Sequence, residues 1–269
     1  MKCRFLAVGL LVNLLCIQTA YAVQPAADLV SAAPIRIILV GDSTMSPRSG
    51  YGDALCQRFQ ANVSCINLAR GGRSSGSFRA EGLWANVQNL LRAGGHYSAT
   101  YVLIQFGHND QPGKPGRSTD LVTEFPVNMA AYVKEVRELG GTPVLVTPLT
   151  RRTFQAGVLE NNLGGWADAS RKVAAEQKVA LLDLNADSYA AVQAMGQAEA
   201  DTLAMAPPPE NVITPAATDT NTVERAGAAK TDFDRTHLGL KGAAFFAAMV
   251  EAELKRIVAP TGPHFKADK

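Results

Sequence analysis

Four short segments carry side chains that could together perform nucleophilic catalysis: residues 41–45, 67–75, 107–110 and 234–237. The first segment contains Ser43, whose hydroxyl is a potential nucleophile. The last contains Asp234 and His237, a carboxylate and an imidazole separated by two residues. This spacing lets Asp234 hold His237 in the tautomer that accepts a proton from a serine hydroxyl. The residue types therefore indicate a serine nucleophile with a histidine base.

The two middle segments could stabilise negative charge. Gly72 follows an apolar run and lets the backbone approach a ligand closely, and the side-chain amide of Asn109 could donate to a developing oxyanion. Segment 67–75 has neither the Gly-Lys-Ser/Thr ending of a P-loop nor the Gly-x-Gly-x-x-Gly spacing of a dinucleotide fold. Taken singly, each segment also fits an ordinary turn or a helix cap.

The hydrophobic pattern predicts the elements that must position these segments. Short apolar runs alternate with helical patterns, which is typical of a parallel sheet with helices on both faces. The expected strands are 35–40, 64–69, 101–106, 142–147 and 179–184. The expected helices are 51–61, 83–93, 120–139, 166–177, 189–198 and 240–257.

The predicted fold class is α/β: a three-layer α/β/α, flavodoxin-like, doubly wound parallel sheet of five strands in the order 2-1-3-4-5. In this order the first three strands are neighbours. Ser43, Gly72 and Asn109 follow those strands at their carboxyl ends. Ligands bind at this edge of a doubly wound sheet. The segment with Asp234 and His237 precedes the last helix and can return to the same edge.

The N-terminus differs in kind from the rest of the chain. Lys2 and Arg4 precede an apolar run, and Ala20-Tyr21-Ala22 is typical of a signal-peptidase site. The run is too short to span a bilayer, so we expect export, to the periplasm or outside the cell, and no stable membrane insertion. The expected divisions are a signal peptide at 1–22, a lead-in at 23–33 and a single domain at 34–269, with a long loop at 200–231.

Composition limits the partners. The formal net charge of +2, from 26 basic and 24 acidic residues, predicts no nucleic-acid partner. Four scattered histidines and the absence of Cys-x-x-Cys predict no metal site, and no organic cofactor is expected.

Export would leave Cys56 and Cys65 in an oxidising compartment, where we favour a disulfide over two buried free thiols. A monomer is expected.

In this order, the four segments resemble the characteristic blocks of the SGNH/GDSL hydrolase superfamily. Gly-Asp-Ser-Thr-Met, Gly-Gly-Arg-Ser and Gly-His-Asn-Asp are similar to the rhamnogalacturonan acetylesterase branch, and the likeness runs over residues 35–257. The resemblance implies a serine esterase that removes acetyl groups from a plant cell-wall polysaccharide such as rhamnogalacturonan or pectin. It implies a triad of Ser43, Asp234 and His237. The implied oxyanion donors are the N–H groups of Ser43 and Gly72 and the side chain of Asn109.

One departure and several alternatives remain. Tyr51 stands between two glycines where this branch often has a tryptophan. The chain could also be an esterase, lipase or thioesterase for other acyl esters, a non-hydrolytic polysaccharide-binding protein or acetyltransferase, or a flavodoxin-like nucleotide-binding protein. The last reading leaves the Asp234–His237 pair unexplained. His108 is expected to be structural, and Trp84 and Trp166 are expected to pack in the core rather than on a sugar.

Overall fold

The computed structural model describes residues 34–209 and 232–267. The expected signal peptide and lead-in, and most of the loop expected at 200–231, lie outside these residues. The division of the chain into leader and domain therefore stays a prediction. In the part of the chain that is described, no helix is long and apolar enough to cross a membrane.

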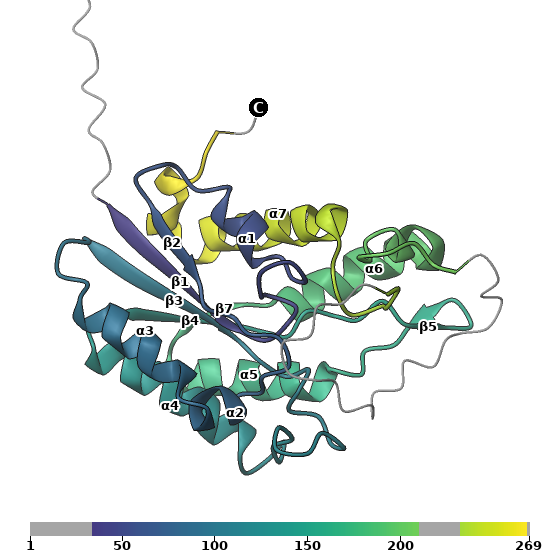
Figure 1. Cartoon of the computed structure of the whole chain (residues 1–269), viewed down its shortest axis with the longest axis horizontal. Helices are drawn as coiled ribbons and strands as arrows, with labels where there is room; N and C mark the ends of the chain where they lie inside the picture. The colour runs from purple at the N-terminus through teal and green to yellow at the C-terminus, as the bar shows by residue number, and fades with distance from the viewer. Residues whose placement is uncertain (1–33, 210–231, 268–269) are drawn as a thin grey trace, which may run out of the picture. The chain divides into compact units, whose positions relative to one another are not determined.

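A five-stranded parallel sheet lies at the centre of the fold (Figure 1). Its strands are β1 (Ile35–Gly41), β2 (Ser64–Asn67), β3 (Ala99–Gln105), β4 (Thr142–Val146) and β7 (Ala180–Leu182). They are arranged in the order β2-β1-β3-β4-β7, which is the predicted 2-1-3-4-5 when the five strands are counted along the chain. The predicted fold class is thus confirmed. Strand β1 is buried along its whole length, as its apolar pattern, interrupted only by Arg36, predicts.

Helices cover both faces of the sheet (Figure 1). One face carries α1 (Gly52–Cys56), α6 (Leu184–Asp201) and α7 (Leu240–Ile257). The other carries α2 (Ser77–Ala80), α3 (Leu83–Arg92), α4 (Phe125–Glu138) and α5 (Gly164–Gln177). Alternate side chains of β1 enter the two resulting cores: Ile37 and Leu39 join one, and Ile38 and Val40 join the other. This alternation is the period of two that a strand imposes.

Several elements have other bounds than predicted. Helix α1 ends at Cys56 rather than near 61 because the chain turns to pair with the C-terminal segment, where Gln60 N–H donates to the carbonyl of His264 at 2.8 Å. Helix α4 begins at Phe125 rather than 120. Asp120 Oδ1 instead closes a turn by accepting from two backbone N–H groups, at 2.9 and 2.7 Å.

Around β7 the predicted boundary between strand and helix was wrong. The strand ends at Leu182, and α6 begins at Leu184 rather than 189. The helical path is interrupted at Gly196, whose φ of 72° is a left-handed value that favours glycine. Helix α6 continues to Asp201, so the chain remains helical past residue 200, where a loop was expected.

Further elements escaped prediction because they are too short to show periodicity. A hairpin of β5 (Phe154–Gln155) and β6 (Val158–Leu159) follows β4, and a 3-10 helix (Ala259–His264) follows α7. Cys56 and Cys65 form the favoured disulfide, which joins α1 to β2 with their Cα atoms 5.4 Å apart.

Candidate active site

Ser43 lies in a tight turn directly after β1. The turn closes through two hydrogen bonds to the carbonyl of Asp42, from Met45 N–H at 3.3 Å and Ser46 N–H at 3.0 Å. Gly41 leads into it at a point where a Cβ atom would lie 2.7 Å from the carbonyl oxygen of Gln105, so only glycine fits. The sequence Gly-Asp-Ser therefore ends the strand and presents Ser43 at the carboxyl edge of the sheet.

Asp234 and His237, nearly two hundred residues further along, meet Ser43 at this edge. His237 Nε2 lies 2.9 Å from Ser43 Oγ, and His237 Nδ1 lies 2.9 Å from Asp234 Oδ2. The second carboxylate oxygen, Oδ1, accepts from the N–H groups of Thr236 and His237, both at 2.7 Å. The three predicted residues thus form one continuous hydrogen-bonded chain.

The electrostatics of this chain suit a base at His237. Burial raises the pKa of Asp234, but the hydrogen bond and charge of His237 and the two backbone N–H groups outweigh burial and hold that pKa well below its usual range. Asp234 is consequently ionised at neutral pH. An ionised Asp234 favours a proton on His237 Nδ1, which leaves Nε2 free to accept the proton of Ser43.

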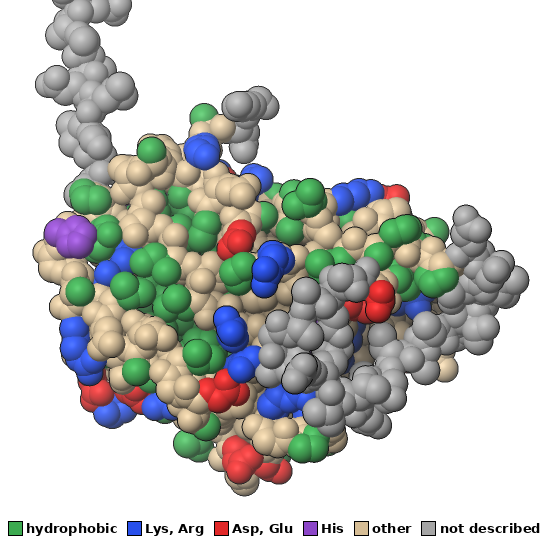
Figure 2. Space-filling model, viewed as in Figure 1, with side chains coloured by type: hydrophobic (Ala, Val, Ile, Leu, Met, Phe, Trp, Pro, Cys, Tyr) green, Lys and Arg blue, Asp and Glu red, His purple; other side chains and the backbone are tan. Residues whose placement is uncertain are grey.

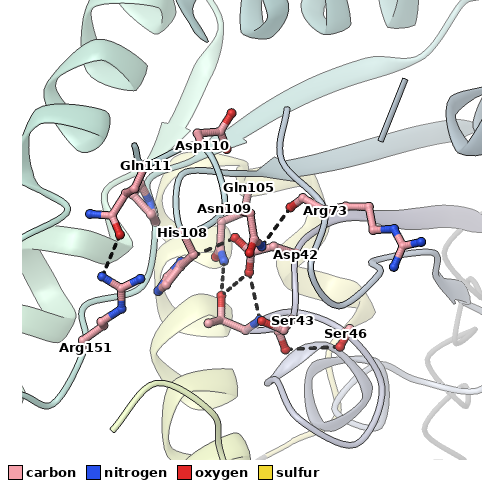
Figure 3. A network of polar contacts seen from close by, with 12 residues as sticks. Asp42, Ser43, Ser46, Arg73, Gln105, His108, Asn109, Asp110, Gln111 and Arg151 are labelled. Atoms are coloured by element: carbon pink, nitrogen blue, oxygen red, sulfur yellow. Dashed lines mark hydrogen bonds and ion pairs between the residues drawn. The ribbon is translucent and has the colours of Figure 1, made fainter. Parts of the chain in front are cut away.

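The predicted oxyanion donors lie on neighbouring strand ends. Gly72 has a φ of 79°, which glycine adopts without strain. Among the described residues, none accepts a hydrogen bond from the N–H of Ser43 or of Gly72. Asn109 Nδ2 donates to the carbonyl of Arg73 at 3.1 Å, which ties Asn109 to the loop that carries Gly72 (Figure 3). Its second N–H remains for a ligand, because an amide has two.

His108 packs against the side chain of Asp42, the residue before Ser43. Its Nδ1 lies 3.4 Å from Asp42 Oδ2, and both side chains are buried (Figure 3). Burial lowers the pKa of His108 against the opposing charge of Asp42, so the ring is neutral at neutral pH. This position fits the structural role expected for His108.

The two tryptophans pack as expected. Trp84 is buried, and its Nε1 donates to Glu135 Oε2 at 2.6 Å. Trp166 is partly buried against the same core.

Two features of the site were not predicted. Arg152 is fully buried and contacts the backbone of residues 234–237. Tyr51 and Gln105 continue a hydrogen-bonded chain to the nucleophile turn. The sequence gives no signal for the role of Arg152, which is only the second of two arginines after a predicted strand. For Tyr51 the only signal was its departure from the tryptophan of the resembling branch.

A parallel α/β/α fold with a hydrogen-bonded Ser–His–Asp chain at the carboxyl edge of its sheet is typical of hydrolases that use a serine nucleophile. Residues 39–244 match the model of the GDSL-like Lipase/Acylhydrolase family, and the chain belongs to this family. It is therefore a carboxylic ester hydrolase, which confirms the predicted superfamily and reaction class.

Known proteins resemble the chain at several levels. The rhamnogalacturonan acetylesterase RhgT of Bacillus subtilis is 36% identical over 178 residues, covering 63% of this chain and 73% of the relative. A crystal structure of the Bacillus subtilis protein YXIM superposes with a TM-score of 0.63 and 25% identity over 83% of this chain and 56% of that one. This chain thus spans little more than half of that protein.

A second solved structure is similar in fold alone. The acetylxylan esterase Axe2 of Geobacillus stearothermophilus has a TM-score of 0.54 at 16% identity, covering 81% of this chain and 93% of that one.

Proposed function

We propose that this chain is a serine acetylesterase that removes acetyl groups from a plant cell-wall polysaccharide such as rhamnogalacturonan or pectin. The observation that carries the proposal is the chain of two 2.9 Å hydrogen bonds from Ser43 through His237 to Asp234. The polysaccharide and the acetyl group are supported by the 36% identity to a rhamnogalacturonan acetylesterase that the chain covers over 73% of its length.

In the proposed reaction, Ser43 Oγ attacks the carbonyl carbon of the acetyl ester while His237 Nε2 takes the hydroxyl proton. The oxyanion of the tetrahedral intermediate accepts from the N–H groups of Ser43 and Gly72 and from the Asn109 amide. The C–O bond to the sugar then breaks as His237 returns the proton to the leaving alcohol. Water attacks the acetyl-serine by the same steps and releases acetate. Neither a metal nor an organic cofactor takes part.

We further propose that residues 1–22 direct export, so that the mature enzyme acts in the periplasm or outside the cell. The Cys56–Cys65 disulfide supports this location, because structural disulfides persist chiefly in oxidising compartments. The protein is expected to act as a monomer.

Acetate release tests the proposal. Wild type, Ser43→Ala and the control Ser98→Ala would be compared on acetylated rhamnogalacturonan, acetylated xylan and a long-chain ester. Ser98 is an exposed serine that precedes β3, at the opposite edge of the sheet from Ser43. We expect acetate from rhamnogalacturonan with wild type and Ser98→Ala, and none above background with Ser43→Ala.

The other outcomes separate the alternatives. Release mainly from xylan would retain the acetylesterase and change its substrate. Hydrolysis of the long-chain ester alone would retain the esterase and overturn the polysaccharide assignment. Release that does not depend on Ser43 would overturn the proposed nucleophile, and no release from any ester would favour a binding protein or an acetyltransferase.

A further inference from the structure

A single residue, Arg152, donates hydrogen bonds to every carbonyl oxygen of residues 234–237. Its backbone N–H binds the carbonyl of Arg235 at 2.8 Å. Its Nη2 binds the carbonyls of Asp234 at 3.0 Å and His237 at 2.7 Å, and its Nη1 lies 3.4 Å from the carbonyl of Thr236. Arg152, which follows β4, therefore binds every residue of the segment that carries His237 and Asp234.

The environment of Arg152 is unusual for an arginine. Its side chain is fully buried, and burial lowers its pKa to about 10, against the raising effect of the negative charges of Asp234 and Asp201. The guanidinium stays charged at neutral pH. A buried charge is weak evidence for stability, because apolar side chains of similar volume often stabilise a protein as well or better. A role in positioning residues 234–237 therefore explains the buried Arg152 better than a contribution to stability does.

Within the segment, Asp234 Oδ1 accepts from the N–H groups of Thr236 and His237, but this turn does not tie the segment to the rest of the fold. The Arg235 side chain points away to Asp201, with bonds of 2.9 and 3.0 Å to the two carboxylate oxygens. Leu238 N–H binds the carbonyl of Ser49 at 2.9 Å, after the segment has ended. Helix α7 begins only at Leu240, so residues 234–237 have no helical hydrogen bonds to fix their path.

We propose that Arg152 is a positioning residue for the ester hydrolysis: by binding the four carbonyls of residues 234–237, it holds His237 within hydrogen-bonding distance of Ser43. This inference rests on the proposed catalytic roles of those two residues. A misplacement of about 1 Å at a catalytic group can cost about 10²-fold in rate. The planar fork of an arginine reaches several acceptors at fixed angles, and the point charge of a lysine does not.

The test measures kcat and KM of Arg152→Met and Arg152→Lys with p-nitrophenyl acetate. We expect kcat of Arg152→Met to fall about 10²-fold with little change in KM, because substrate binding is left intact while the base is misplaced. Arg152→Lys keeps the charge and should show a smaller loss of kcat. The matched control is Arg36→Met, which removes another buried arginine that binds a backbone carbonyl, that of Leu90 at 2.6 Å, at the far end of β1.

A double-mutant cycle with Asp234→Asn separates positioning from stability. If Arg152 acts through the Asp234–His237 pair, Asp234→Asn should cost much less in the Arg152→Met background than in wild type. The low-field NMR signal of the proton on His237 Nδ1 should also shift or vanish in folded Arg152→Lys. A merely structural arginine would move neither readout.

The outcomes decide between the two proposals. A folded Arg152 variant with wild-type kcat, or losses that multiply in the cycle, would overturn the positioning role while leaving a Ser43-dependent esterase intact. Failure of both Arg152 variants to fold beside a folded Arg36→Met would also overturn it, because the role would then be structural. If Ser43→Ala hydrolysed the ester as fast as wild type, the proposed function itself would be overturned instead.

Discussion

The hydroxyl of Tyr51 donates a hydrogen bond to Gln105 Oε1, 2.8 Å away, and begins a buried chain that ends beside Ser43. Gln105 Nε2 donates to Thr44 Oγ1 at 2.7 Å, and Thr44 Oγ1 donates to Asp42 Oδ1 at 2.8 Å. The direction of every bond is fixed, because an ionised carboxylate can only accept. Asp42 and Thr44 flank Ser43, so this chain connects the end of β3 to the turn that carries Ser43.

Tyr51→Phe should destabilise the fold by about 1–3 kcal/mol, because it leaves Gln105 Oε1 buried without its donor. Urea unfolding monitored by circular dichroism measures the change. The control is Tyr97→Phe, which alters a half-buried tyrosine whose ring lies beneath the guanidinium of Arg36. An equal effect in both variants would count against the Tyr51–Gln105 chain. The chain also gives a physical reason for a tyrosine, with its hydroxyl, at this position.

Asn109→Ala should lower kcat by about 10²–10³ with little change in KM, because an oxyanion donor acts in the transition state rather than on the bound ester. Steady-state kinetics with p-nitrophenyl acetate provide both constants. Asn89→Ala, at an exposed position on α3, is the matched control. Wild-type turnover in Asn109→Ala would remove Asn109 from the oxyanion hole.

Asp234→Asn should lower kcat by about 10⁴, because an amide can present its N–H to His237 and stabilise the wrong tautomer. The pKa of Asp234 is held well below its usual range, so Asp234 stays ionised from neutral to mildly acidic pH and the loss should persist throughout the range in which wild type is active. Rate measurements on Asp234→Asn and on the exposed control Asp168→Asn test this. A loss confined to one end of the pH range would contradict the assigned role of Asp234.

Asp110 should make the stability depend on pH. Burial raises its pKa from 3.8 to about 7, so the folded chain keeps a proton that the unfolded chain releases as the pH rises between these values. The contribution of Asp110 to the free energy of unfolding should therefore fall over that window and level off above it. The pKa of Asp234 lies well below this window, whereas the lowered pKa values of His108 and His264 add a slope of opposite sign below pH 6.5, so a comparison with an Asp110 variant isolates the contribution of Asp110.

Asp110→Asn should remove this falling contribution. Oδ1 of Asp110 already accepts from Ser75 Oγ at 2.5 Å and from Thr119 Oγ1 at 2.9 Å, so an asparagine can keep both bonds and carry its NH₂ at the other position. Melting temperatures of wild type and Asp110→Asn across pH 4–8 measure the difference. Parallel curves would show that Asp110 has no raised pKa.

The sheet was predictable because strands that are buried on both faces consist of nearly continuous apolar runs. Ile35 to Val40 contains one polar residue, Arg36, and every strand end that carries a site residue is marked by glycine or a short polar cluster. Ser43, Gly72 and Asn109 could be placed together because strand order brings the carboxyl ends of the first three strands to one edge, whereas Asp234 and His237 were assigned to the same site by their spacing and by the family resemblance.

What could not be predicted depends on contacts between distant segments. Nothing near Arg152 in the sequence indicates that it binds residues 234–237, since that pairing exists only after folding. The early end of α1 has the same origin, because Gln60 bonds to His264 more than 200 positions away. Short elements such as the β5–β6 hairpin lack the length that a hydrophobic period needs.

The small net charge predicts a surface without a large field of one sign. Figure 2 shows basic, acidic and apolar side chains interspersed over the face in view, in line with the small net charge. Substrate choice therefore has to be measured directly, as the comparison of three esters does.

Covalent labelling tests the central claim most directly. Wild type, Ser43→Ala and His237→Ala would be treated with a fluorophosphonate and digested, and tandem mass spectrometry would locate the adduct. An activated serine reacts with this reagent, whereas an ordinary serine does not. The account predicts one adduct on Ser43 in wild type, none in Ser43→Ala and far slower labelling in His237→Ala. An adduct on another residue, or labelling of Ser43 that is as fast without His237, would contradict it.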